Sequence, residues 1–249
     1  MRVERRWTEV AGFRVHSLHA GPSGGPSVVL LHGLSGSHRW WLKTMPALAQ
    51  GFRVHVPELV GFGGSRRAAR QPGLEEMARV IVAWLDMLGI ERPHLVGHSM
   101  GGQVSIHLAA AQPERIDRLV LVAAAGIPRR LTLPGVRRFV RELVAPRAWV
   151  RPRFASTIAL DALRAGPKAL LQTTRHILAD DVRPLLPLIR NATLLIWGAL
   201  DPLTPLANGE EMARAIPGAR LVVLRAAAHI PMVEWPEAFN RTLLGFLAP

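Results

Sequence analysis

The 249-residue chain contains neither cysteine nor tyrosine. The lack of cysteine excludes a disulfide framework, zinc sites built on thiolates and a cysteine nucleophile. The lack of tyrosine excludes a phenol as a catalytic acid or nucleophile. Serine, histidine and carboxylate side chains are therefore the main candidates for chemistry.

Lysine is also scarce, since only Lys43 and Lys168 are present. Arginine makes up almost all of the 31 basic residues, which outnumber the 18 acidic ones and give a formal net charge of +13. This charge could attract nucleic acid, anionic lipid or an acidic substrate, although coding bias in a GC-rich genome explains it more simply. No basic stripe is interleaved with aromatic residues, so we expect no nucleic-acid partner.

Long apolar runs are missing as well. No run approaches the ~20 residues needed to cross a bilayer. The first ten residues, MRVERRWTEV, lack the apolar segment of a signal peptide. The composition, 49% hydrophobic and 20% charged, is that of a globular protein with one sizeable core. We therefore expect a soluble, cytoplasmic protein with no transmembrane segment.

Short apolar runs alternate with helical patterns along the chain, which is typical of a parallel β-sheet with crossover helices. The predicted strands cover residues 27–32, 52–56, 94–97, 116–124, 192–197 and 220–224. The predicted helices cover residues 40–50, 74–88, 101–111 and 236–246. The sequence thus predicts an α/β fold.

Residues 127–190 break this alternation, because they carry Leu, Ala, Arg and Pro at helical spacing and no run typical of a strand. We interpret this segment as a helical insertion between two strands of one sheet. The predicted division is a core of residues 1–126 and 188–249 and a helical cap, or lid, of residues 127–187. A lid would lie over the carboxyl edge of the sheet, where open α/β sheets bind ligands.

The strongest motif is Gly97-His98-Ser99-Met100-Gly101, which lies between a predicted strand and a predicted helix. A G-x-S-x-G sequence in this context is typical of a nucleophile elbow, a sharp turn that presents a serine hydroxyl at the top of a sheet. The glycines let strand and helix pack closely around the strained turn. Ser99 is therefore the candidate nucleophile.

A serine nucleophile needs a base and an acid that orients the base, and in this elbow they follow in the order acid, then histidine. His229 lies in a loop of small residues after the strand 220–224, so we predict it to be the base rather than His107 or His176. Asp201 follows the strand 192–197 and would face the same sheet edge as Ser99. Asp117, Asp161, Asp180 and Asp181 are less well placed.

Backbone N–H groups are needed to bind the developing oxyanion. We predict that Met100, after the nucleophile, and Leu34, in the loop His32-Gly33-Leu34-Ser35-Gly36, supply them. His32 is expected to brace this loop. No cofactor or metal is expected, since H-E-x-x-H is absent and residues 61–64 lack the spacing of a dinucleotide fingerprint.

Four segments together resemble the α/β-hydrolase superfamily: HGLSG near Leu34, GHSMGG at Ser99, WGALDPLTP at Asp201 and AAHIPMVEWPEAFN at His229. The stretch VPELVGFGGS is similar to a loop of that family that usually has aspartate where this chain has Glu58. The resemblance covers about residues 10–126 and 188–249. It implies a mostly parallel eight-stranded sheet, with the insertion as the family's variable cap.

The resemblance and the triad together predict a serine hydrolase of the carboxylesterase type, which cleaves small esters of short to medium acyl chain through an acyl-enzyme. Alternatives are C–C bond hydrolysis, lactone hydrolysis or acyl transfer with the same triad, or a ligand-binding protein that retains the fold. Similar C–C hydrolases tend to have asparagine before the serine and tryptophan after the histidine, where this chain has His98 and Ile230. Cofactor-free haloperoxidases usually have an aromatic residue and proline at Leu34-Ser35, and dehalogenases and epoxide hydrolases use an aspartate nucleophile.

The excess charge is concentrated in the predicted cap, where residues 127–155 contain eight arginines and one glutamate. Arg137, Arg138 and Arg141 would lie opposite an apolar face of one cap helix. A solvated surface is the simpler interpretation. The alternative is a weak attraction of the cap to anionic surfaces or acidic substrates.

Overall fold

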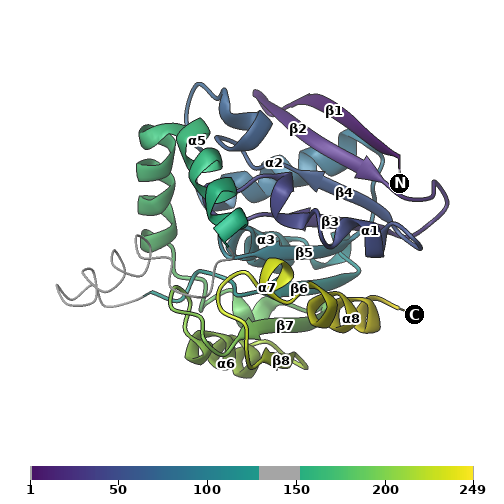
Figure 1. The fold of residues 1–249 in the computed structure, drawn as a ribbon, viewed down its shortest axis with the longest axis vertical. Coiled ribbons are helices and arrows are strands. Elements are labelled where there is room, and N and C mark those ends of the chain that lie inside the picture. The colour runs from purple at the N-terminus through teal and green to yellow at the C-terminus, as the bar shows by residue number, and fades with distance from the viewer. Residues whose placement is uncertain (1, 129–151, 249) are drawn as a thin grey trace.

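The computed structural model describes residues 2–128 and 152–248, and an eight-stranded sheet forms its centre (Figure 1). The strands are β1 (Val3–Val10), β2 (Phe13–Ala20), β3 (Ser27–Leu31), β4 (Arg53–Pro57), β5 (His94–His98), β6 (Arg118–Val122), β7 (Ala192–Gly198) and β8 (Arg220–Leu224). They lie in the order β1-β2-β4-β3-β5-β6-β7-β8. The pairs β1–β2 and β2–β4 are antiparallel and all other pairs are parallel.

This architecture confirms the predicted fold class and each of the six strands expected from the sequence. The first two strands were not expected. They form a hairpin closed by Ala11 and Gly12, both of which have positive φ, as the tight turns of two-residue hairpins require. Most of β1 is exposed and half of its residues are charged, so it lacks the apolar alternation that marks a half-buried strand.

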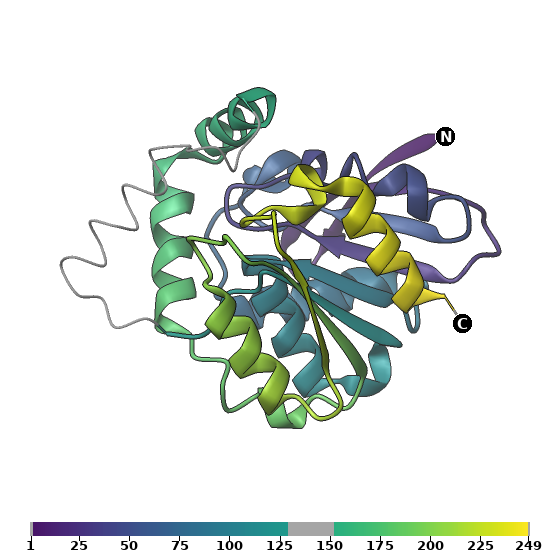
Figure 2. The same cartoon turned by 60° about the horizontal axis from the view of Figure 1, so that its bottom comes forward.

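Helices cover both faces of the sheet, as Figure 2 shows from a second side. They are α1 (Met45–Leu48), α2 (Leu74–Met87), α3 (Met100–Ala111), α5 (Pro152–Ala179), α6 (Leu206–Ala215), α7 (Pro231–Glu234) and α8 (Pro236–Leu247). Side chains of α2, α3 and α6 share one apolar cluster, and those of α1, α7 and α8 share another. Along β3, Val29 and Leu31 enter the first cluster and Val28 and Leu30 the second, because successive side chains of a strand point to opposite faces.

The single helix expected over residues 40–50 is wrong. The chain forms a 3-10 turn, η1 (His38–Trp41), and then the four-residue helix α1. Pro46 occupies the first turn of α1, where a residue without a backbone N–H is tolerated. The same residue could not continue a helix from η1, and the chain therefore begins a new one.

In the segment between β6 and β7, the described part is α5 followed by the short 3-10 turn η4 (Leu186–Leu188), with no strand among its described residues. Gly166, with φ of 79°, and Pro167 divide α5 into two helical stretches. Contacts from α5 reach Ser37 after β3 and Gln103 in α3 after β5, so α5 lies along the edge where the parallel strands end. The predicted arginine-rich helix with Arg137, Arg138 and Arg141 lies outside the described residues.

No helix in the described ranges is both long enough and apolar enough to span a membrane.

The packing of α2 on the sheet predicts how substitutions in this helix change the free energy of unfolding. Leu85 is fully buried in the first apolar cluster, whereas Met87, on the same helix, is 64% exposed. Leu85→Ala is expected to lower the free energy of unfolding by about 2–5 kcal/mol, because it leaves a cavity in the core. Met87→Ala should change it by less than about 0.5 kcal/mol. Urea unfolding of both variants measures the difference, and equal effects would contradict the assigned packing.

Candidate active site

Ser99 stands between the end of β5 and the start of α3, in a backbone conformation that L-residues rarely adopt. Its φ is 51° and its ψ is −117°. The strain persists because three backbone hydrogen bonds hold the residue: Ser99 N–H donates to Val122 O, and Ser99 O accepts from Gln103 N–H and Ala125 N–H. The sheet and the helix thus fix the direction in which the hydroxyl points.

Glycine is required after Ser99 because neighbouring chain segments approach the start of α3 too closely for a side chain. A Cβ at Gly101 would lie 2.5 Å from Leu31 O and 2.6 Å from His32 O, both in the neighbouring strand and its loop. A Cβ at Gly102 would lie 2.6 Å from Ala124 Cβ. Any side chain at these positions would push α3 away from the strands and move Ser99 with it.

The structure brings together the three side chains that the sequence predicted. His229 Nε2 lies 3.1 Å from Ser99 Oγ, and His229 Nδ1 lies 2.9 Å from Asp201 Oδ2. Asp201 and His229 are buried, with 7% and 5% of their surface exposed. The three residues come from loops after β5, β7 and β8, which end at the same edge of the sheet.

The carboxylate of Asp201 is held by its own loop. The backbone N–H groups of Leu203 and Thr204 donate to Oδ1 at 2.8 and 2.9 Å. The Thr204 hydroxyl lies 2.7 Å from Oδ2, the oxygen that also faces His229. These contacts orient the carboxylate toward the imidazole.

The loop of His229 is held by Glu234, a buried carboxylate that the sequence reasoning missed. Its oxygens accept hydrogen bonds from the N–H groups of Ala228 and Ile230, which flank the histidine. Burial raises the pKa of Glu234 above its ordinary value. From the elbow side, His98 Nε2 donates to His229 O at 2.8 Å. No sequence signal marks Glu234, because its role depends on how the loop of His229 folds back onto it.

The predicted oxyanion donors lie against the elbow. Met100 is the first residue of α3, and the first N–H groups of a helix have no partner inside it. The loop of Leu34 touches the nucleophile, since a Cβ at Gly33 would lie 3.1 Å from Ser99 Cβ. Ser35 has a φ of 60°, which makes this loop a second strained segment at the site.

The alternative histidines and acids have different partners. His107 Nε2 lies 2.8 Å from Asp180 Oδ2, and His176 Nδ1 lies 3.1 Å from Pro72 O. Asp161 binds the Ser37 hydroxyl and the Arg39 guanidinium. None of these contacts involves Ser99.

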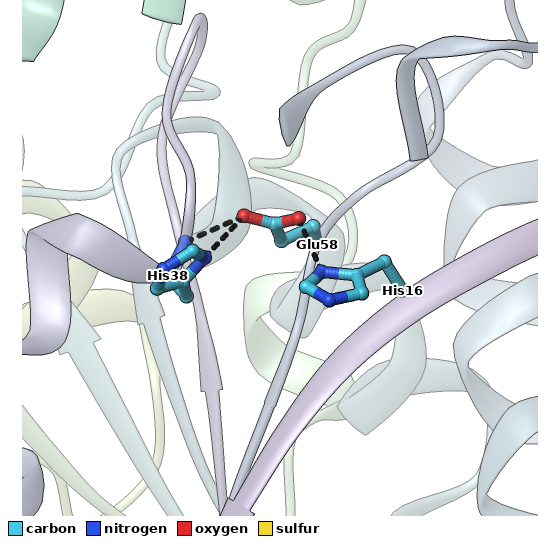
Figure 3. Close-up of side chains that lie close together, drawn as sticks. All are labelled: His16, His38 and Glu58. Carbon is cyan, nitrogen blue, oxygen red and sulfur yellow. Dashed lines mark hydrogen bonds and ion pairs between the residues drawn. The ribbon is translucent and has the colours of Figure 1, made fainter. Parts of the chain in front are cut away.

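Another buried carboxylate, Glu58, lies just after β4 between two imidazoles (Figure 3). His38 Nδ1 and His16 Nδ1 each lie 2.7 Å from one of its two oxygens. The backbone N–H groups of His38 and Gly64 also donate to the carboxylate. These hydrogen bonds outweigh the effect of burial and hold the pKa of Glu58 far below its ordinary value.

His16, His38 and Glu58 are also the one group in the described ranges whose ligand atoms lie close enough, within 4.8 Å of one another, to hold a metal ion. Each Nδ1, however, points at a carboxylate oxygen at hydrogen-bond distance. A nitrogen that carries this proton cannot ligate a metal, because metal ligands must be deprotonated. The arrangement is that of a hydrogen-bonded cluster.

The sequence matches two known family models. Residues 26–176 match the family described as alpha/beta hydrolase fold, and residues 179–248 match the family described as TAP-like protein. The protein belongs to the α/β-hydrolase family, as its four motifs indicate.

Individual relatives carry out different reactions. The chain is 32% identical to a dihydrolipoyllysine-residue acetyltransferase component of an acetoin cleaving system from Pseudomonas putida, over 96% of this chain and 68% of that protein. It is 30% identical to 2-hydroxy-6-oxo-6-phenylhexa-2,4-dienoate hydrolase from Burkholderia cepacia, over 96% of this chain and 93% of that protein. The crystal structure of the enol-lactonase from Burkholderia xenovorans LB400 superposes with a TM-score of 0.80. The two chains are 28% identical, and the superposition covers 98% of this chain and 100% of the lactonase. The dienoate hydrolase and the enol-lactonase support hydrolase chemistry without selecting the bond that is cleaved, and the acetyltransferase component shows that the family's reactions vary.

The cluster around Glu58 makes a prediction about acid stability. A carboxyl group whose pKa is lower in the folded than in the unfolded chain stabilises the fold above its unfolded value, near 4.5, and loses that effect as the pH falls below it. The difference in unfolding free energy between the wild type and Glu58→Gln should therefore be largest above pH ~5.5 and shrink toward pH ~3.

Urea unfolding at a series of pH values measures this difference. Glu210→Gln, at an exposed position, is the control and should differ little from the wild type throughout. A Glu58→Gln difference that stays constant down to acid pH would contradict the assigned stabilisation.

Proposed function

We propose that this protein is a serine hydrolase that cleaves carboxylic esters of small molecules through an acyl-enzyme intermediate. The observation that carries the proposal is the continuous path from Ser99 Oγ to His229 Nε2 and from His229 Nδ1 to Asp201, with distances of 3.1 and 2.9 Å. A nucleophile, a base and an orienting acid at hydrogen-bond distance are the requirements for nucleophilic catalysis by serine.

In the first half-reaction, Ser99 Oγ attacks the ester carbonyl carbon while His229 Nε2 takes the hydroxyl proton. The carbonyl oxygen becomes an oxyanion, which the N–H groups of Leu34 and Met100 bind. Asp201 stabilises the imidazolium that forms. The bond to the alcohol oxygen then breaks, and His229 returns the proton to the departing alcohol.

In the second half-reaction, water attacks the acyl-enzyme and His229 again accepts a proton. The tetrahedral intermediate uses the same two N–H groups. Collapse of this intermediate breaks the bond to Ser99 Oγ, returns the proton to the serine and releases the carboxylic acid. The triad and the two N–H groups therefore act twice in each turnover.

Residues 127–187 act in this proposal as a cap over the site. Phe154 in α5 packs on Trp40, with ring centroids 5.8 Å apart, and Trp40 packs on His98, with ring centroids 5.4 Å apart. The cap is thus joined to the elbow by aromatic contacts. The Leu and Ala content of the cap sequence favours an apolar acyl pocket and thus short to medium acyl chains.

Hydrolysis of a lactone or of a C–C bond is the second candidate, because relatives 28–30% identical over nearly the whole chain include an enol-lactonase and a dienoate hydrolase. A lactone is a cyclic ester and needs the same steps. His98 and Ile230, in place of the asparagine and tryptophan typical of similar C–C hydrolases, favour the ester. Rates on p-nitrophenyl esters of graded chain length, lactones and a vinylogous diketone would separate the three.

Removal of the nucleophile is the first test of this mechanism. Ser99→Ala is expected to lower kcat for a p-nitrophenyl ester by a factor on the order of 10⁶ and to keep the fold. A fluorophosphonate should label the wild type once, at Ser99, and leave the variant unlabelled. Mass spectrometry and circular dichroism check both points. Full activity of Ser99→Ala would refute the mechanism.

The choice of acid makes a separate prediction. Asp201→Asn retains the shape of the side chain but favours the wrong imidazole tautomer, so kcat should fall by a factor on the order of 10⁴. Asp181→Asn is the matched control, because Asp181 pairs with Arg183 and not with the site. An active Asp201→Asn together with an inactive Asp180→Asn or Asp181→Asn would show that the acid is misassigned.

A further inference from the structure

The five residues from Gly33 to Ser37, called the oxyanion loop below, are held at both ends by two consecutive residues of another loop. Glu58 and Leu59 follow β4, which is the neighbour of β3 in the sheet. Leu59 contacts the residue before the oxyanion loop, and Glu58 contacts the residue after it. Neither Glu58 nor Leu59 contributes a group to the triad.

The start of the loop is held through the ring of His32. Leu59 N–H donates to His32 Nε2 at 3.0 Å, and His32 Nδ1 donates to Gly33 O at 2.8 Å. The ring is completely buried, and burial lowers the pKa of His32. A neutral ring with one donor and one acceptor nitrogen satisfies both contacts, and it fixes the carbonyl that precedes Leu34.

The far end of the loop is held by Glu58. His38 donates to Glu58 Oε1 twice, from its backbone N–H at 3.0 Å and from Nδ1 at 2.7 Å. The other oxygen, Oε2, accepts from His16 Nδ1 in β2 (Figure 3). It also accepts from Gly64 N–H. The carboxylate is 1% exposed. His16 and Gly64, which lie outside the oxyanion loop, thus hold the carboxylate in place, and its other oxygen binds His38.

The loop itself has little freedom between these ends. Gly36 N–H donates to Gly33 O at 3.0 Å, which closes a turn around Leu34 and Ser35. A Cβ at Gly36 would lie 2.8 Å from His32 Nδ1, so the turn packs directly on the ring that Leu59 holds. The Ser37 hydroxyl adds a contact to Asp161 in α5. Because the loop is rigid, a displacement of His38 would also move the backbone of Leu34.

We infer that Glu58 is a positioning residue for the oxyanion hole, which acts through His38 to hold the Leu34 N–H at the distance that the tetrahedral oxyanion requires. The inference rests on the function proposed above for Ser99 and Leu34. It assigns a role to a carboxylate that touches neither the substrate nor the triad. Loss of one oxyanion donor typically lowers kcat by 10²–10³, and an error of about 1 Å in placement is enough to cost 10²-fold.

The test replaces Glu58 with glutamine. Each carboxylate oxygen accepts two hydrogen bonds, so an amide nitrogen in place of either oxygen faces two donors. Glu58→Gln is expected to lower kcat for a p-nitrophenyl ester by about 10- to 100-fold with little change in KM. Its Ki for a trifluoromethyl ketone, whose adduct with Ser99 carries the oxyanion, should rise by a similar factor. The Kd of an ether analogue of the substrate, which has no carbonyl oxygen, should stay constant.

Variants at His38 keep the test decisive if Glu58→Gln does not fold. The amide nitrogen of His38→Asn can replace Nδ1 as a donor to Glu58, whereas His38→Leu removes this donor. We expect His38→Leu to reproduce the loss in kcat and in affinity for the ketone, and His38→Asn to restore most of both. Glu210→Gln is the matched control at an exposed glutamate and should behave as the wild type.

Two results would overturn the inference. One is a folded Glu58→Gln or His38→Leu protein with wild-type kcat and wild-type affinity for the ketone. The other is a loss of activity on dialysis against EDTA that Zn²⁺ restores, since the cluster would then hold a metal. Failure of the proposed function itself is recognised separately, because Ser99→Ala would then retain activity in the wild-type background.

Discussion

The site depends on one constraint, the strained backbone of Ser99 in the turn from β5 to α3. Positive φ at a serine is unfavourable by itself, and it is maintained here by hydrogen bonds to Val122, Gln103 and Ala125. Backbone of β3 leaves no room for a side chain at Gly101. The elbow therefore needs the neighbouring strands β3 and β6 on either side of β5, and the sheet sets the positions of the partner loops around the hydroxyl.

The parallel order of β3 to β8 explains why residues far apart in the sequence converge. Loops after β3, β4, β5, β7 and β8 leave the same edge of the sheet, which brings together the oxyanion loop, Glu58, Ser99, Asp201 and His229. Two histidines at this edge are held by a partner from another loop. His98 supports His229 from the elbow, and Leu59 supports His32 from the next strand.

Two buried carboxylates outside the triad each accept hydrogen bonds from backbone N–H groups of a loop at the site. Glu234 accepts the N–H groups on either side of His229, and Glu58 accepts the N–H and the ring of His38 beside the oxyanion loop. In both cases a side chain satisfies backbone donors that a loop without regular structure cannot pair by itself. Rigid loops are what a preorganised site needs, because catalysis loses little energy to reorganisation when donors are already in place.

The sequence by itself determined the strands of the parallel sheet and the turn at Ser99, because apolar runs and glycine spacing are local signals. Chain order and position after the strands predicted Asp201 and His229 as companions of Ser99, and the structure places their side chains beside it. It did not reveal the hairpin of β1 and β2, whose outer strand is exposed and charged, nor the break between η1 and α1. The roles of Glu58 and Glu234 were decided only by tertiary structure. A carboxylate becomes a buried acceptor when folding brings donors to it, and those of Glu58 come from positions 16, 38 and 64, which no local pattern connects.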